Sequence, residues 1–168
     1  MALAVALPLF QPWRLFTDKV VDEALPGTVP ISTQTSSTTP PTVFVKPPKA
    51  PEPTKILLTG QLITHEHETS GTVAVLRLPD GSRVLRIENL ETSDGPDLKV
   101  WLSDAKVVDG RTGWHIFDDG KYRDLGSLKG NHGNQNYAIP AGVKLDDFRS
   151  VAIWCDRFNV SFGAARLA

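Results

Sequence analysis

The sequence contains a single cysteine among its 168 residues. One thiol cannot form an intramolecular disulfide, so a disulfide-stapled scaffold is excluded. A metal cluster held by several thiolates of one chain is excluded for the same reason. A lone cysteine does not fix the cellular compartment, because in an exported protein it is either buried or reactive.

The chain also lacks an excess of charge of either sign. Its 18 Lys and Arg residues oppose 19 Asp and Glu residues, which gives a formal net charge of −1. Nucleic-acid-binding domains concentrate positive charge on one face, and this balance provides no such footprint. We therefore expect no nucleic-acid partner.

Motifs for common catalytic chemistry are missing as well. The sequence has no G-x-S-x-G nucleophile elbow, no phosphate-binding loop and no dinucleotide fingerprint. Its many carboxylates lack the spacing of a calcium-binding loop, and turn formation accounts for them. We therefore expect neither an enzyme in the ordinary sense nor a bound cofactor.

No long hydrophobic run is present at the N-terminus. The apolar stretch MALAVALPLF has ten residues, whereas a bilayer takes about 20. Trp13 and Arg14 follow it, as interfacial residues follow a membrane helix. We interpret residues 1–25 as an apolar segment, the end of a truncated membrane anchor, followed by a short helix over Thr17–Leu25. The alternative is an apolar tail on a soluble protein.

The composition changes abruptly after this segment. Residues 26–54 contain 8 Pro and 10 Ser or Thr among 29 residues. Such a segment has too few backbone donors and too little apolar surface to form a packed core. We predict a disordered stalk that reaches at most roughly 90 Å at about 3.1 Å per residue. This composition is typical of extracellular stalks and favours a domain on the extracytoplasmic side of the cell membrane; a cytoplasmic linker is the alternative.

Short alternating runs separated by turns fill residues 55–168. The expected strands are Ile56–Ile63, Thr72–Leu78, Ser82–Leu90, Asp97–Ser103, Gln135–Ile139, Arg149–Cys155 and Asn159–Ala165, with a further short strand near Trp114–Phe117. Pro79-Asp80-Gly81 joins the second and third strands as a hairpin. Seven or eight strands without a long helical period indicate an all-β fold, an antiparallel β-sandwich.

Cys155 ends one of these strands. Alternation places it on one face with Val151 and Ile153, and places Trp154 on the other face. A free cysteine on an apolar face is usually a small buried hydrophobe. A position at the end of the strand, two residues before Arg157, instead favours partial exposure and a thiolate. Both interpretations stay open from the residues alone.

The pair His65 and His67 is the second candidate for chemistry. In an extended segment the two imidazoles lie on one side, about 7 Å apart, which is compatible with a shared copper or zinc ion. His115 and His132 complete such a site only if the fold brings their loops together. The alternative is a solvated, polar strand end, because the H-x-H pattern is short and common.

Four separated elements of residues 55–168 recur together in one known family. They are the G-T-V hairpin entry, Asn89-Leu90 leading to Gly95-Pro96-Asp97-Leu98, the segment from Leu128-Lys-Gly-Asn131 to Tyr137, and Trp154-Cys155 leading to Phe162-Gly163-Ala164. In this order they resemble the DM-thirteen domain, also called the electron-transfer DM-thirteen domain. The resemblance covers nearly all of Lys55–Ala168, and the layout as a single domain behind a stalk looks like that of membrane-anchored bacterial members.

The resemblance implies a compact β-sandwich-like domain that is usually extracytoplasmic. It also implies a redox role for the family's cysteine, and Cys155 within Trp-Cys-x-x-Phe is the matching position, with Trp154, Arg157 and Phe158 as neighbours. The chain carries no haem domain and no C-x-x-C-H motif, so an electron partner has to be another protein.

Two hypotheses about function follow, beside a third in which the domain binds a metal ion through His65 and His67. In the first, a membrane-tethered extracytoplasmic domain transfers electrons through Cys155. In the second, the domain is a non-catalytic cell-surface binding or structural module, and Cys155 is part of the core packing. The two hypotheses differ in the accessibility of one sulfur atom.

Overall fold

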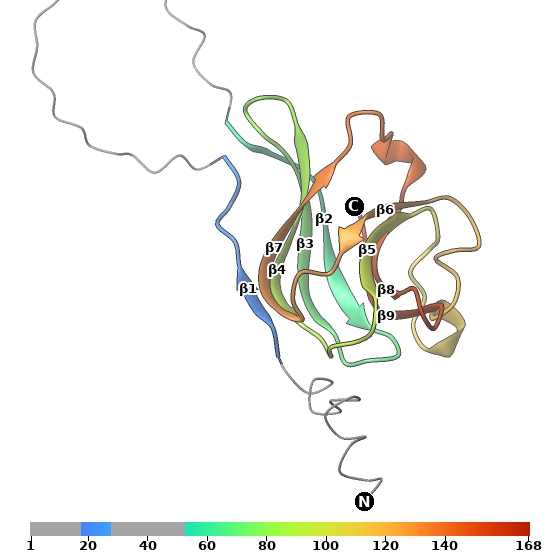
Figure 1. The fold of residues 1–168 in the computed structure, drawn as a ribbon. Helices are drawn as coiled ribbons and strands as arrows, with labels where there is room; N and C mark the ends of the chain where they lie inside the picture. The colour runs from blue at the N-terminus through green and yellow to red at the C-terminus, as the bar shows by residue number, and fades with distance from the viewer. Residues whose placement is uncertain (1–17, 28–52) are drawn as a thin grey trace, which may run out of the picture.

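A computed structural model describes residues 18–27 and 53–168. These residues form one sheet of nine strands, in the order β1-β7-β4-β3-β2-β9-β8-β5-β6. The strands are β1 (Val20–Asp22), β2 (Lys55–Thr64), β3 (Ser70–Arg77), β4 (Arg83–Glu91), β5 (Leu98–Ser103), β6 (Tyr122–Ser127), β7 (His132–Ile139), β8 (Ser150–Cys155) and β9 (Val160–Arg166). The sheet curls over so that its two halves face each other (Figure 1). The predicted all-β fold is confirmed.

Strand β2 belongs to both halves of the curled sheet. Its first part, Lys55–Gln61, pairs with β3, and its last part, Leu62–Thr64, pairs with β9. Gly60 stands near this change of partner, and a side chain there would collide with the carbonyl of Arg166. Glycine at this position therefore permits the close approach on which the curl depends.

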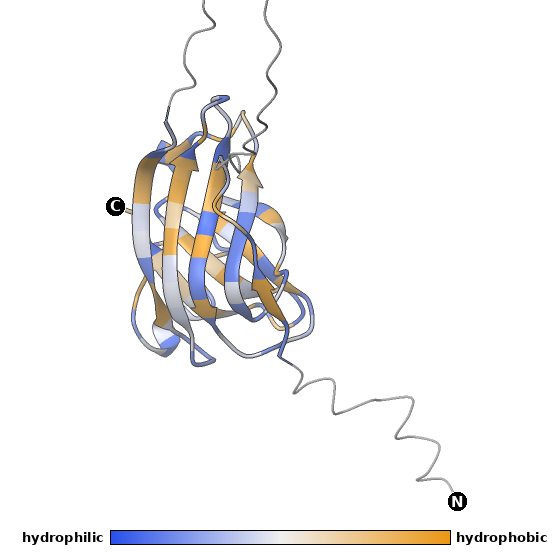
Figure 2. Cartoon of the chain, turned by 90° about the vertical axis from the view of Figure 1, so that its left-hand side faces the viewer, coloured by the Kyte–Doolittle hydropathy of each residue, from blue (hydrophilic) through white to orange (hydrophobic). Residues whose placement is uncertain are grey.

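Alternation of side chains along the strands builds a central core between the two halves. Its fully buried members include Val75 on β3, Leu85 on β4, Val100 on β5 and Ile153 on β8. Figure 2 shows the same alternation as apolar and polar bands along the strands. Burying each such side chain stabilises the fold by about 1.5–3 kcal/mol, so this core holds the two halves together.

A second, smaller cluster lies on the outer face of the β5–β8–β9 half. It consists of Trp101, Phe117, Ala152, Trp154 and Ala164, and residues of the 104–121 segment cover it. No strand forms near Trp114–Phe117, where the sequence predicted one; the segment contains a 3₁₀ turn at Arg111–Gly113. Apolar residues of this segment instead pack over the outer cluster.

The short helix predicted over Thr17–Leu25 is wrong for the part that the structure describes. Val20–Asp22 form strand β1, which pairs with β7 in parallel. A single helix of this length is marginal in water, and β-branched residues such as Val20 and Val21 fit a strand. The edge of β7 offers backbone partners, so tertiary pairing prevails over local propensity.

The apolar residues before Thr17, and most of the Pro-rich segment, lie outside the described residues. Within residues 18–27 and 53–168, no helix has the length and apolar composition needed to cross a membrane. The membrane anchor therefore stays a prediction from sequence.

Candidate functional site

Cys155 is the last residue of β8, and its side chain is fully buried at 0% exposure. It belongs to the central core together with Val151 and Ile153, while Trp154 belongs to the outer cluster. The predicted division of β8 into two faces is confirmed. The adjacent strands place Leu98 and Val160 opposite Cys155.

One loop covers the sulfur atom. Cys155 Sγ donates a hydrogen bond to the carbonyl oxygen of Pro96 at 3.3 Å. Pro96 is half-buried, whereas Asp94 and Asp97 beside it are exposed. We call residues 93–97 the cover loop. The buried thiol is therefore in contact with a loop whose residues 93, 94 and 97 face solvent.

Further contacts hold the cover loop in place, among them an ion pair between Asp97 Oδ1 and Lys99 Nζ at 2.7 Å. Asp97 O accepts a hydrogen bond from Asp156 N at 3.1 Å, just beyond Cys155. Gly95 packs so closely on the Phe162 ring that an added Cβ would lie 2.8 Å from it. Asp97 also adopts φ 64°, a left-handed conformation that aspartate tolerates better than most residues. The loop is thus attached at a few points and not through a strand ladder.

The predicted neighbours of Cys155 lie in different environments. Trp154 is fully buried in the outer cluster, whereas Arg157 and Phe158 are exposed in the turn after β8. Phe158 N donates to Cys155 O at 3.3 Å, which closes this turn. Phe158 is 62% exposed, a large value for an aromatic side chain. The end of β8 therefore presents an apolar ring beside a cationic side chain.

A cleft adjoins the cover loop. It has a volume of about 300 Å³ and is lined by Lys19, Asp94, Gly95, Asp97, Leu98, Ser127, Leu128, Lys129, Gly130 and Asn131. The lining is polar, and it carries both cationic and anionic side chains. Leu98, which lines this cleft, pairs with Cys155 across the sheet.

His65 is buried against the outer cluster. Its Nδ1 lies 2.9 Å from Ser161 Oγ, and its ring centre lies 5.8 Å from that of Phe117. Nε2 faces the backbone of Val108 without a well-formed hydrogen bond. Burial lowers the pKa of His65 below its ordinary value of 6.5, because the charged imidazolium loses its hydration there. His65 is accordingly neutral near pH 7.

His67 has different contacts. Residues 65–67 form a bend and not an extended strand, so the spacing assumed for a shared metal ion does not apply. The His67 ring packs on Phe162 at 3.8 Å between ring centres, and its Nε2 lies 3.6 Å from the carboxylate of Glu66. His65 contacts the outer cluster through Phe117, whereas Phe162 belongs to the central core.

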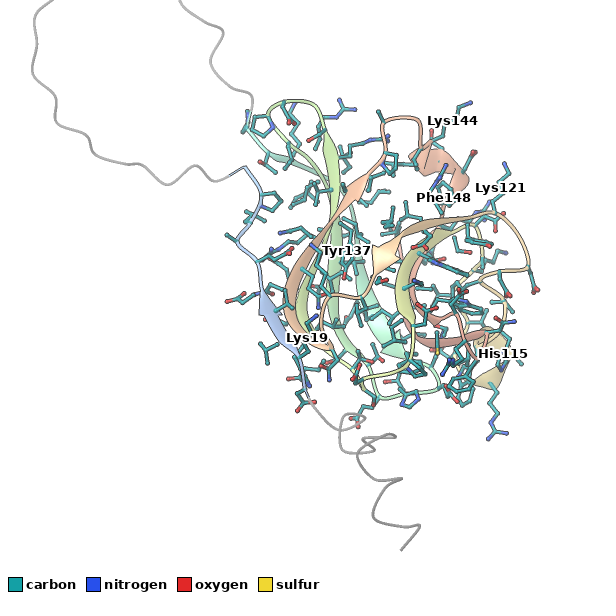
Figure 3. The ribbon with its side chains drawn as sticks, viewed as in Figure 1. Lys19, His115, Lys121, Tyr137, Lys144 and Phe148 are labelled. Carbon is teal, nitrogen blue, oxygen red and sulfur yellow. The ribbon has the colours of Figure 1, made fainter. Side chains whose placement is uncertain are left out.

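The other two histidines also have separate partners. His115 Nδ1 lies 2.6 Å from Asn159 O, and His132 Nε2 lies 3.2 Å from an Asp18 carboxylate oxygen. His115 is on the opposite side of the domain from Lys19, which neighbours Asp18 (Figure 3). No group of three or more His, Cys, Asp or Glu side chains suited to a metal occurs in the described part of the chain. A metal ion at His65 and His67 stays a prediction.

Comparison with family models identifies the domain. The model described as Electron transfer DM13 matches residues 61–167, which is more than half of the chain. The chain belongs to the electron-transfer DM13 family. The match includes Cys155 and its cover loop, and it excludes β1. No curated protein and no solved structure matches the chain.

The DM13 domain also contains an aromatic stack that sequence reasoning missed. Tyr122 stacks on Trp101 with 4.1 Å between ring centres, and Trp101 stacks on Trp154 at 5.0 Å. Tyr122 is 48% exposed, so the stack runs from the surface to the residue before Cys155. Its signal in the sequence is the outward face shared by Trp101 and Trp154, but β6, which carries Tyr122, was not predicted.

Proposed function

We propose that this protein is an electron-transfer module whose redox group is Cys155, held on the extracytoplasmic side of a membrane by its N-terminal segment. Membership of the electron-transfer DM13 family supports electron transfer as the function. One observation carries the assignment to Cys155: its sulfur is hydrogen-bonded to the carbonyl oxygen of Pro96, in a loop where Asp94 and Asp97 are exposed. In this proposal the domain is a carrier between partner proteins, not an enzyme, and it uses no cofactor.

A single thiol carries two electrons by exchange with partners that have paired cysteines. The Cys155 thiol loses its proton to solvent, and the thiolate attacks the disulfide of an acceptor protein, forming a mixed disulfide and releasing one acceptor thiolate. A thiolate of a dithiol donor then attacks the Cys155 sulfur and releases the second acceptor thiolate. The donor's other thiolate attacks its own bonded sulfur, which closes the donor disulfide and frees Cys155.

This chemistry requires transient exposure of a buried sulfur. Local opening of a few contacts costs less free energy than global unfolding, and loops with few buried apolar contacts open most readily. The cover loop fits this description, because its contacts near the sulfur are those of Pro96, Asp97 and Gly95 described above. Exposed Phe158 and Arg157 at the end of β8 offer a docking point of the aromatic and cationic type that is enriched at interfaces.

Timed alkylation of the native protein tests the proposal. Two reference thiols are introduced into Cys155→Ser: Ser93→Cys on the exposed cover loop, and Val151→Cys on the same core face as Cys155. We expect wild-type Cys155 to react more slowly than the surface thiol and much faster than the core thiol, after correction for differences in global stability. A rate equal to that of Val151→Cys would mean that only global unfolding exposes Cys155, and it would refute the redox role.

The second candidate is a non-catalytic cell-surface binding or structural module. The full burial of Cys155 among core residues favours it. A rate measurement distinguishes this candidate from the electron-transfer module. Electron transfer between a disulfide acceptor and a dithiol donor is measured in the presence of wild-type protein and of Cys155→Ser. If both proteins give the rate of the uncatalysed exchange, the packing role is correct.

The membrane location needs its own test. It is supported by the apolar N-terminal stretch, the Trp13-Arg14 pair after it, and the Ser/Thr/Pro-rich composition of residues 26–54. We expect the full chain to sediment with membranes and to be cleaved by protease added outside intact cells. Val5→Glu combined with Leu7→Glu should release it, and sedimentation unchanged by this variant would contradict anchoring.

A further inference from the structure

Strand β1 lies on the edge of β7, although it is outside the part of the chain that matches the family model. Its residues pair with β7 in parallel, Val20 with His132 and Asp22 with Asn134. The family match begins only at residue 61. We call residues Asp18–Ala24 the latch segment, and the edge of the sheet from Gly130 to Asn136 the β7 groove.

Two glycines open the β7 groove to the backbone of the latch segment. A side chain at Gly130 would collide with the carbonyl of Lys19, and one at Gly133 with the carbonyl of Val21. Gly133 also adopts φ 98°, which disfavours any other residue. Figure 3 shows Lys19 at the beginning of the latch segment and Tyr137 on the neighbouring strand. The groove is therefore shaped for close backbone approach.

The groove is held in shape by its own buried polar groups. Gln135 is fully buried, and its Oε1 accepts from Lys129 N at 3.1 Å while its Nε2 donates to Gly130 O at 2.6 Å. Tyr137 Oη donates to the same Gln135 oxygen at 2.7 Å. None of these bonds involves the latch segment. The loop that carries Lys129, Gly130 and Asn131 is thus fixed from within the family domain.

Two buried side chains of the domain bond to the backbone of the latch segment. Asn131 Oδ1 accepts from Lys19 N at 2.6 Å. Arg86 is only 5% exposed, and its Nη1 donates to Glu23 O at 2.7 Å and to Ala24 O at 3.3 Å. Such bonds recognise an extended backbone irrespective of its side chains.

The acidic side chains of the latch segment have individual partners. Glu23 uses both oxygens: Oε1 binds Lys129 Nζ at 2.6 Å and Oε2 accepts from Asn136 N at 2.7 Å. Asp22 Oδ1 accepts from Asn134 Nδ2 at 2.6 Å. Asp18, at the start of the segment, bonds to Asn131 Nδ2 at 3.0 Å. The charge and spacing of the groove thus suit an acidic, extended segment.

The segment between β1 and β2 is long enough for the β7 groove to bind the latch segment of its own chain or that of a second copy. Gly27 lies beside Thr54, since an added Cβ on Gly27 would be 2.8 Å from Thr54 Oγ1. The residues that flank the intervening segment 28–53 therefore lie side by side. Its 26 residues span at most about 90 Å when fully extended, which is enough to reach a neighbouring copy.

We propose that the β7 groove is a docking site for an extended acidic segment, that the latch segment is its tethered ligand, and that the latch segment of a second copy takes its place by strand exchange. The mode is addition of a strand to a sheet edge. While the latch segment is docked, Asp18 lies on the domain. The Pro-rich segment then does not separate residues 1–17 from the domain. When the latch segment is released, the Pro-rich segment becomes a spacer between them.

A labelled peptide of sequence TDKVVDEAL, residues 17–25, tests the groove. The receptor is the full chain with Val21→Pro, which removes one backbone donor and the strand conformation of its own latch segment. We expect saturable binding to this variant and at least about tenfold weaker binding to wild type, whose groove faces its own segment at a millimolar effective concentration. Equal binding to both, or none to folded Val21→Pro, refutes the groove. Failure of Val21→Pro to fold shows that β1 is an integral strand and refutes the proposal as well.

A charge swap tests whether recognition depends on the ion pair. Lys129→Glu, added to Val21→Pro, should weaken binding of the peptide about tenfold, because like charges then face each other. The peptide with Glu23→Lys should recover the lost affinity for this receptor and bind poorly to the receptor with Lys129. Equal binding of both peptides to both receptors would contradict the proposed recognition.

Strand exchange is tested with two full-length copies. Tagged Val21→Pro should retain untagged Lys129→Glu on an affinity column, because that copy has an intact latch segment and a weakened groove of its own. Tagged Val21→Pro with Lys129→Glu should retain much less of it. Retention equal for both tagged proteins, or absent for both while the peptide binds, would refute exchange between copies. These experiments involve no thiol, so their failure leaves the role of Cys155 unaffected.

Discussion

The thiol of Cys155 lies 3.3 Å from the carbonyl oxygen of Pro96, a residue 59 positions earlier in the chain. This hydrogen bond joins the end of β8 to the cover loop. The two hypotheses about function differ in whether it opens in the folded protein. A closed loop makes Cys155 a core residue, and an open loop makes it a surface nucleophile. The free energy of opening is therefore the quantity that decides the function.

Replacing the sulfur should separate its packing from its hydrogen bond. Cys155→Ala leaves a small cavity and the unpaired Pro96 carbonyl, and we expect a loss of about 1–2 kcal/mol in the free energy of unfolding. Cys155→Ser keeps a donor for this carbonyl but buries a more polar group, so its loss should be of similar size. Urea denaturation of both variants measures the losses. A change below about 0.5 kcal/mol in both would show that the site is not tightly packed.

His65 should make stability depend on pH near neutrality. Burial lowers the pKa of His65 in the folded state below its ordinary value of 6.5, so the unfolded chain binds more protons just below that pH. Stability therefore falls as pH drops below about 6.5, towards the lower pKa of the folded state. Denaturation of wild type and His65→Asn at several pH values measures the difference in slope.

Asparagine in place of His65 keeps a polar group near Ser161 Oγ but does not titrate. We therefore expect His65→Asn to lose stability by a nearly constant amount above pH 7 and to show a smaller slope below about pH 6.5. The nearby Asp109 opposes the shift, because its charge favours protonation of His65. An identical slope in both proteins would contradict the burial of a neutral imidazole.

The stack of Tyr122, Trp101 and Trp154 should give a spectroscopic signature. Two indoles with ring centres 5.0 Å apart interact closely enough for their electronic transitions to couple. We expect an exciton couplet in the circular dichroism spectrum that disappears in Trp101→Phe and in Trp154→Phe. Trp114→Phe is the matched control, because Trp114 is not part of the stack, and it should retain the couplet. Survival of the couplet in either of the first two variants would rule out the stacked arrangement.

Local patterns predicted the faces of individual strands. The period of two placed Cys155 with Val151 and Ile153 and separated it from Trp154, and the structure has this arrangement. Side-chain direction in a strand follows from backbone geometry alone, so it needs no knowledge of the partners.

Features that depend on distant partners were not accessible from the sequence. The cover loop reaches Cys155 only because β5 pairs with β8, and nothing near Pro96 in the sequence indicates this pairing. Strand β1 was mistaken for a helix because its partners, such as Arg86 and Asn131, come from the domain. In both cases the local sequence is compatible with several conformations, and tertiary contacts select one.

Gly163 should tolerate no side chain. An added Cβ would lie 2.5 Å from Thr69 Cγ2 and 2.8 Å from Ile63 O, and the backbone oxygen cannot rotate away. Thr69 is itself fixed by hydrogen bonds to Phe162 O at 3.0 Å and to Thr92 at 2.8 Å. We expect Gly163→Ala to destabilise the domain by about 1–3 kcal/mol through overpacking. Gly142→Ala is the control, because no atom lies within 4 Å of its added Cβ, and it should change stability by less than about 0.5 kcal/mol. Equal urea midpoints for the two variants would show that β2 and β9 separate easily at this point.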